Sequence, residues 1–161
     1  MAVIDVTVAG LALDEQNKAP VVVLKDASGE KVLPIVIGIM EASAIAAQLE
    51  GVQFPRPMTH DLMGRIIEEL GGKLVEVEVC DLVDDTFMAL LHIEVGEKRV
   101  SIDARPSDSI ALALRCKAKI TVNERVFEKA VPGAEAPKED DKMWQDVLEN
   151  MNEDDFGKYK M

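Results

Sequence analysis

The sequence has few cysteines, few aromatic residues and no long apolar segment. Its two cysteines, Cys80 and Cys116, are far apart and outside any Cys-x-x-Cys pattern, so we expect two buried free thiols and no disulfide or zinc site. Aromatic residues make up 4% of the chain, so aliphatic side chains and Met must fill the core. No stretch reaches the length of a membrane span, and the N-terminal segment lacks the basic start of a signal peptide. These absences, with the free thiols, predict a cytoplasmic protein with no membrane partner.

Positive charge and several well-known catalytic motifs are also scarce. The chain has 18 Lys and Arg against 30 Asp and Glu, for a net charge of -12 and a pI of about 4.6. This balance disfavours passive adhesion to DNA or to an anionic membrane. The sequence has no GxSxG, Walker loop, GxGxxG after a strand, or HExxH, so any chemistry must come from another arrangement.

What is present is a mixture of short strands and helices. Apolar runs with turn signals between them predict strands at 3–13, 19–26, 31–38, 73–83, 86–95, 98–104 and 119–122. Helical spacing predicts helices at 39–50, at 60–70, around 110–114 and, after an Asn123 cap, to residue 130. Tight hairpins outnumber alternating strand–helix units, which indicates an α+β class: one compact domain, residues 1–132, with a largely antiparallel mixed sheet and several packed helices. Val100 and Ile102 are expected to face its core.

The composition changes near residue 131. Pro, Gly, Ala and acidic residues follow one another there, as in a linker. Residues 133–161 hold nine acids and four bases. We expect an acidic linker and a helical C-terminal tail, too small to fold alone, which docks on the domain or on a protein partner. Its apolar stripe is Met143, Trp144, Val147, Leu148 and Met151.

The segment DARPSDSIALAL, residues 103–114, concentrates polar chemistry ahead of an apolar helix. A structural explanation is available: Ser107 or Asp108 caps the helix, and Asp103 pairs with Arg105. One cap, however, needs neither a second carboxylate nor a guanidinium nearby. The segment is therefore a candidate functional site as well.

The segment RPMTHD, residues 56–61, repeats this pattern. Thr59 is expected to be the N-cap of the next helix, and Asp61 suits its dipole. His60 should lie on the exposed side of that helix start, either as an incidental surface residue or as a metal ligand or general base. The other histidine, His92, lies in mid-strand and is expected at the surface. Glu41, in the first turn of the Ala-rich helix, either complements the helix dipole or joins the site.

If folding brings these segments together, their carboxylates and imidazole would suit a hard cation, Mg²⁺ or Mn²⁺, that positions a phosphodiester and activates water. Two arginines could then hold phosphate oxygens. The candidate metal ligands are Glu41, Asp61, Asp103 and Asp108. The candidate catalytic residues are His60, Asp61, Asp103 and Asp108. The candidate phosphate-binding residues are Arg56, Thr59, Arg105 and Ser107.

Four segments in this order, LPIVIGIMEASAIA, RPMTHDLM, GGKLVEVEVCDL and DARPSDSIALALR, closely resemble the bifunctional nuclease domain family. The resemblance covers roughly residues 3–130. It implies nuclease activity on DNA and RNA and a compact α+β fold that self-associates into a homo-oligomer. From the residues alone, two alternatives stay open: a non-catalytic oligomeric interaction module, and a module that binds a small anionic ligand without hydrolysis.

Overall fold

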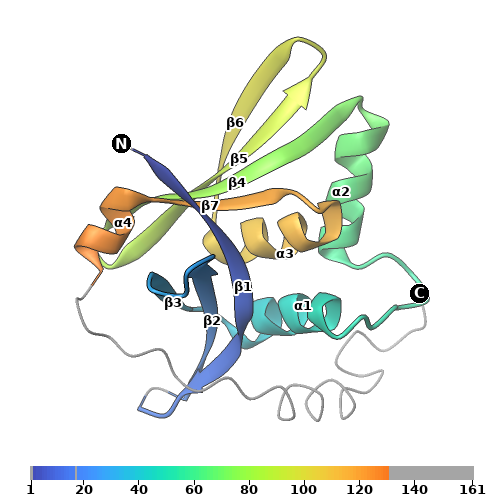
Figure 1. Cartoon of the computed structure of the whole chain (residues 1–161). Helices are drawn as coiled ribbons and strands as arrows, with labels where there is room; N and C mark the ends of the chain where they lie inside the picture. The colour runs from blue at the N-terminus through green and yellow to red at the C-terminus, as the bar shows by residue number, and fades with distance from the viewer. Residues whose placement is uncertain (1, 17, 131–161) are drawn as a thin grey trace.

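The computed structural model describes residues 2–16 and 18–130, which form one α+β domain. Figure 1 shows the arrangement of its helices around a twisted sheet. The described strands are β1 (Val3–Asp14), β2 (Ala19–Asp26), β3 (Val32–Val36), β4 (Gly72–Val83), β5 (Thr86–Val95), β6 (Lys98–Ala104) and β7 (Lys119–Asn123). The described helices are α1 (Ile39–Leu49), α2 (Thr59–Glu69), α3 (Pro106–Cys116) and α4 (Glu124–Lys129).

The seven described strands form one mixed sheet in the order β3-β2-β1-β7-β4-β5-β6. All neighbouring pairs are antiparallel except β4 and β7, which are parallel. The expected α+β class and largely antiparallel sheet are therefore confirmed. The short strand β7 is central, and it joins the two hairpin groups into one sheet.

The turns between strands follow from local backbone chemistry. Asp84 and Asp85 have φ of 49° and 61°, and two successive positive φ values suit the tight turn that joins β4 to β5. Gly96 has φ of 60° in the turn from β5 to β6, a conformation that costs glycine little. Asn123 caps α4 as expected, because its side chain accepts a hydrogen bond from the Arg125 backbone N–H at 3.1 Å.

Helices α1 and α3 lie side by side against the sheet (Figure 1). Helix α3 packs on β4, β5 and β7, and residues Ser109–Ala113 in it are all buried. This confirms the expectation of a buried helix around 110–114. Ile45 of α1 and Ile110 and Leu112 of α3 are fully covered and join the strand residues in one core. Burial of such side chains contributes about 1.5–3 kcal/mol each.

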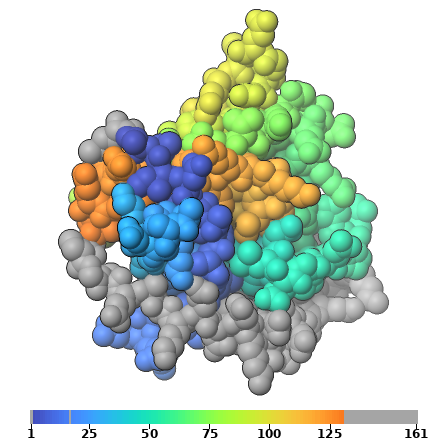
Figure 2. Space-filling model, in the orientation of Figure 1, coloured from blue at the N-terminus to red at the C-terminus, as the bar shows by residue number. Residues whose placement is uncertain are grey.

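Some expectations about burial are wrong. Val100 and Ile102 of β6 are 40% and 45% exposed, because the β5–β6 hairpin projects beyond the helices (Figures 1 and 2). The apolar residues of α2 lie in two environments: Met63 and Ile67 pack on the core, whereas Leu62, Ile66 and Leu70 are exposed.

The cysteines are free, as expected, but both are half-buried. Burial raises the pKa of both the Cys80 and the Cys116 thiol above the ordinary value. The linker and tail, residues 131–161, lie outside the described residues, so the docking expectation stays a prediction. Within the described part of the chain, no helix combines the length and apolarity required to cross a bilayer.

Candidate functional site

The first turns of α1 and α3 and the start of α2 meet at one place. Helix α3 begins after Arg105, with Pro106 in its first position, where the ring's fixed φ and missing N–H cost nothing. Asp108 lies in that first turn, and Glu41 lies in the first turn of α1. His60 is the second residue of α2. The fold thus brings together four of the residues singled out in the sequence: Glu41, His60, Arg105 and Asp108.

These four side chains form a continuous polar network. Arg105 Nε donates to Asp108 Oδ2 at 2.9 Å, and Arg105 Nη1 donates to Glu41 Oε1 at 3.2 Å. His60 Nε2 lies 3.0 Å from Asp108 Oδ1. The Asp108 carboxylate therefore bridges a guanidinium and an imidazole. The expected Asp103–Arg105 pair is wrong, because Arg105 turns toward Asp108 and Glu41 instead.

His60 is buried, with 8% of its surface exposed, so the expectation of an exposed position is wrong. The reason is the close approach of α2 to α3. Gly64 lies one turn after His60, and a Cβ there would be 3.2 Å from Cys116 Sγ. The small residue lets the two helices pack tightly, and His60 on the same face of α2 is pressed against the Asp108 carboxylate.

The network sets the charge of Asp108. Burial works to raise the pKa of this carboxyl, but the hydrogen bonds from Arg105 and His60 outweigh it and hold the pKa below the usual range. The hydrogen bond to Asp108 in turn raises the pKa of the Arg105 guanidinium. The site therefore presents an ionised carboxylate held between two nitrogen groups.

The expected caps are not those observed. Met58 is the N-cap of α2 and Thr59 is its first helical residue, because the Asp61 carboxylate satisfies the Met58 N–H at 2.9 Å. In α3 the N-cap is Arg105, and neither Ser107 nor Asp108 caps the helix. Asp108 is occupied by the network.

Arg115, in the last turn of α3, is a member of the site that the sequence pattern did not single out. Its side chain is 8% exposed, and it donates to Asp61 Oδ1 at 2.8 Å, to the Ala111 carbonyl at 2.8 Å and to the Ala44 carbonyl at 3.0 Å. It thus ties together α1, α2 and α3. A signal was available, because residue 115 is two helical turns after Asp108 and so lies on the same face of α3.

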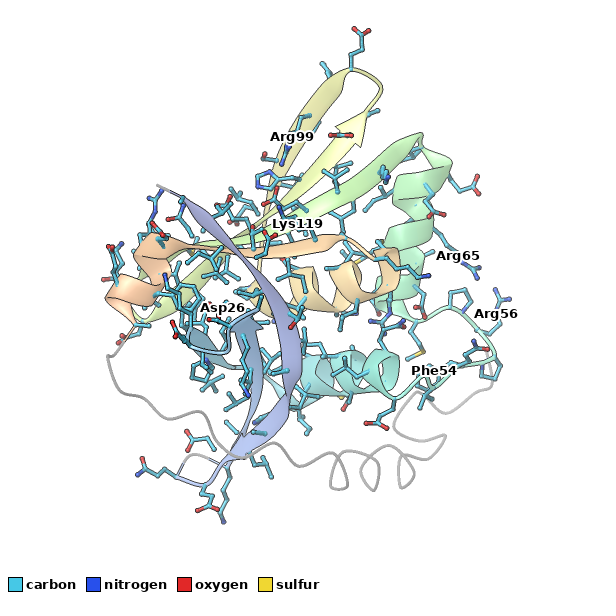
Figure 3. All side chains as sticks on the ribbon, in the orientation of Figure 1. Asp26, Phe54, Arg56, Arg65, Arg99 and Lys119 are labelled. Atoms are coloured by element: carbon cyan, nitrogen blue, oxygen red, sulfur yellow. The ribbon has the colours of Figure 1, made fainter. Side chains whose placement is uncertain are left out.

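Three adjoining cavities surround the network. One, of about 250 Å³, is lined by Glu41, Thr59, His60, Arg105 and Asp108 among others. A second, of about 490 Å³, shares Phe54 and Arg115 with it and adds Arg56, Asp61 and Arg65. A third, of about 360 Å³, shares Glu41 and Arg105 and includes the buried Ser107. Figure 3 shows Phe54, Arg56 and Arg65 on the side of the molecule where α2 begins.

Asp103 stands apart from these cavities. It is exposed on β6, its Cα pairs with Leu90, and it lines none of the three. No hydrogen bond or ion pair joins its carboxylate to another side chain of the described residues. Of the predicted site residues, Glu41, His60, Arg105 and Asp108 form the network, and Thr59 lines the same cavity. Arg56 and Asp61 line the second cavity and Ser107 lines the third, whereas Asp103 lies apart from all three.

The residues as arranged do not fit a metal ion. Within residues 2–16 and 18–130, no three His, Cys, Asp or Glu side chains are grouped closely enough to hold one. The Arg105 guanidinium already lies between the Glu41 and Asp108 carboxylates, and the Asp61 carboxylate is engaged by Arg115. The expected Mg²⁺ or Mn²⁺ stays a prediction, to be tested in solution.

The chain belongs to the bifunctional nuclease domain family, whose pattern it matches over residues 22–133. Among its relatives is an uncharacterized protein of Mycobacterium tuberculosis strain H37Rv, 40% identical over 156 residues that make up 97% of this chain and 90% of the relative. Bifunctional nuclease 2 of Arabidopsis thaliana is 33% identical over 111 residues, and bifunctional nuclease 1 of Oryza sativa subsp. indica is 31% identical over 109 residues. These matches cover 67% and 65% of this chain but only 33% of each plant protein.

Proposed function

We propose that this protein is a nuclease that hydrolyses phosphodiester bonds in DNA and RNA. Family membership supports the class of activity, and two plant relatives carry the name bifunctional nuclease. The observation that carries the proposal is the His60–Asp108 pair at 3.0 Å, beside Arg105 and in a cavity. An imidazole oriented by a carboxylate is a common general acid–base arrangement.

In this proposal His60 moves the proton. The Asp108 carboxylate can only accept, so it fixes the tautomer in which His60 Nε2 carries hydrogen and Nδ1 keeps its lone pair. No hydrogen bond to Nδ1 is formed within the described residues. His60 Nδ1 takes a proton from a water molecule as its oxygen attacks the phosphorus atom. The bond from phosphorus to the leaving oxygen breaks, and the imidazolium returns the proton to that oxygen.

Arg105 holds the phosphate. Its side chain is 64% exposed, and its Nη2 group remains available beyond the bonds to Asp108 and Glu41. A guanidinium donates to phosphate oxygens in a planar fork and stabilises charge that develops there. Arg56 and Arg65 line the neighbouring cavity, so an extended strand could continue past the site along cationic side chains.

Aspartates 61 and 103 receive different roles from those expected. Asp61 positions the site by holding Arg115, which lines two of the cavities. Asp103 lies on β6, outside the three cavities, and takes no part in the proposed chemistry. Thr59 lines the central cavity and Ser107 the third, where their hydroxyl groups can donate to phosphate.

The test is cleavage of labelled single-stranded DNA and RNA by the purified chain, with Mg²⁺, with Mn²⁺ and with chelator. We expect His60→Gln to abolish cleavage. The matched control is His92→Gln, since His92 is the only other histidine and its Nδ1 bonds to Ser101 Oγ at 2.8 Å on β6. Cleavage that survives in His60→Gln, or that is lost equally in both variants, would reject the proposed role. Loss of activity with chelator would show that a metal binds despite the arrangement of the described residues.

A second candidate is binding of a small anionic ligand without hydrolysis. The 490 Å³ cavity favours it, because Arg56 and Arg65 have no ion pair with another described residue. A rise in melting temperature with nucleoside monophosphates, in a protein that cleaves neither DNA nor RNA, would support this alternative.

A further inference from the structure

Strand β6 lies at one edge of the seven-stranded sheet, on a hairpin that projects from the domain (Figures 1 and 2). Among the described strands it pairs with β5 alone, on one side, and its residues from Lys98 to Asp103 are all exposed. An exposed edge strand is a template for pairing with another chain unless the sequence prevents it. The side chains of β6 therefore determine which chain can pair with its free edge.

The two faces of β6 differ in character. Val100 and Ile102 pair with Ile93 and Leu91 of β5, which are buried, so they continue the apolar face of the sheet. The alternate residues Arg99, Ser101 and Asp103 lie on the opposite, polar face. Ser101 Oγ lies 2.8 Å from His92 Nδ1, so the side chains of Ser101 and His92 lie on the same face of the sheet.

We infer that β6 pairs antiparallel with β6 of a second copy about a two-fold axis at Ser101. Such an axis is perpendicular to the sheet, so residues that face each other must share a face, and their numbers must add to an even total. All seven residues of β6, Lys98 to Ala104, are paired only in the register in which the two facing residue numbers add up to 202. That register places Arg99 opposite Asp103 of the partner subunit, and Val100 opposite Ile102 of the partner subunit.

The charged residues of β6 favour pairing with a second copy over the alternative that they only protect the exposed edge from aggregation. Protective charges on an edge strand work by repulsion, so charges of one sign would suffice. Here opposite charges occupy positions equidistant from Ser101, and directly opposite pairs of this kind are stabilising. Asp103 has no side-chain partner in the described residues, and Arg99, though bonded to Glu76 at 3.0 Å, is 51% exposed and keeps further donors.

The pairing has a consequence for the candidate site. Ala104 would lie opposite Lys98 of the partner subunit, and Arg105 follows Ala104 directly. A second copy would therefore bring another cation toward the mouth of the site. The inference does not depend on nuclease activity, because it follows from the edge strand alone.

The test uses charge reversal in the full chain, with size measured by light scattering and sedimentation. Wild type should be an oligomer built from dimers. Arg99→Asp and Asp103→Arg should each raise the dimer dissociation constant about tenfold or more, because two symmetry-related pairs change from attraction to repulsion. An equimolar mixture of the two variants should restore the size. In the mixed dimer the introduced aspartate faces the introduced arginine, and the remaining native pair, Arg99 and Asp103, is also matched.

Two further variants separate this interface from a loss of folding. Glu76→Gln removes the partner of Arg99 within the chain and should leave the size unchanged. Ser101→Cys should cross-link two copies on oxidation, whereas Glu97→Cys at the hairpin tip should not. A monomeric wild type overturns the inference. So does an oligomer whose size is the same in wild type, Arg99→Asp and Asp103→Arg, which would assign the contact to another surface or to the C-terminal tail.

Discussion

Substitution of Asp108 by asparagine tests the chemistry of the site with the smallest change of shape. The carboxylate accepts from Arg105 Nε at 2.9 Å and contacts His60 Nε2 at 3.0 Å, so each oxygen has one nitrogen partner. An asparagine side chain keeps one acceptor and replaces the other with an NH₂ donor. If its oxygen stays with the always-protonated Arg105, its NH₂ group faces His60 Nε2.

The expected effect follows from the tautomer. An NH₂ donor at Nε2 forces the imidazole to carry its hydrogen on Nδ1, which removes the lone pair that would take a proton from water. General acid–base catalysis contributes about 10²–10⁴-fold, and loss of the orienting carboxylate in comparable pairs costs the upper part of that range. We therefore expect kcat to fall on the order of 10²–10⁴-fold in Asp108→Asn, with a much smaller change in KM.

Single-turnover cleavage of a labelled oligonucleotide measures the effect, with His92→Gln as the matched control. The double variant Asp108→Asn/His60→Gln should be no more defective than His60→Gln alone, because the two residues act as one unit. If Asp108→Asn keeps near wild-type kcat while folding normally, the reasoning about the tautomer is refuted.

Three other predictions concern stability. Arg115→Met should lower the free energy of unfolding by about 2–4 kcal/mol in urea, because Asp61 Oδ1 and two backbone carbonyls lose the hydrogen bonds that the buried guanidinium donates; a loss below about 1 kcal/mol would contradict this. Gly38→Ala should displace the Glu41 carboxylate, which lies where the new Cβ would be, yet cost no more than about 1 kcal/mol, because φ of -77° and ψ of 161° suit any residue; a larger loss would show that the Glu41 carboxylate cannot move aside without destabilising the network. The lowered pKa of Asp108 stabilises the fold fully above the ordinary value of 3.8, and this contribution should disappear as the pH falls toward the lower folded value, so acid unfolding should be steeper in wild type than in Asp108→Asn.

Local patterns predicted most of the elements but not how they assemble. The Asp84–Asp85 turn and the alternation of β4 are local, and the hairpin forms as expected. The position of β7 between β1 and β4 is a long-range pairing. The five residues of β7 carry no signal for their parallel partner β4, from which two strands and one helix separate them in the chain. Exposure of Val100 and Ile102 has the same origin, because their alternation shows which face they share but not where the helices stop covering it.

For a similar reason, the sequence predicted which segments form the site but not which of their side chains are in contact. The two Arg-Pro segments stood out by composition, and the fold brings His60 of one segment to Asp108 of the other across 48 residues. Which carboxylate meets which cation depends on helix packing. Gly64 permits the approach of α2, and this places Asp61 against Arg115 and His60 against Asp108. Asp103, two residues before Arg105, is directed to the sheet edge because it still belongs to β6.

The distribution of charge reconciles a net charge of -12 with the polyanionic substrate of the proposed nuclease. Four of the six arginines in the sequence line the three adjoining cavities: Arg56, Arg65, Arg105 and Arg115. The acidic excess includes nine carboxylates in residues 133–161, which lie outside the described residues. At about 0.1 M salt, charges more than about 10 Å apart are largely screened, so the side chains beside a bound phosphate decide its local energy. In the proposed function, binding of a nucleic-acid strand at this face would therefore depend on the arginines in the cavities, whereas the net charge governs solubility and discourages nonspecific contacts elsewhere.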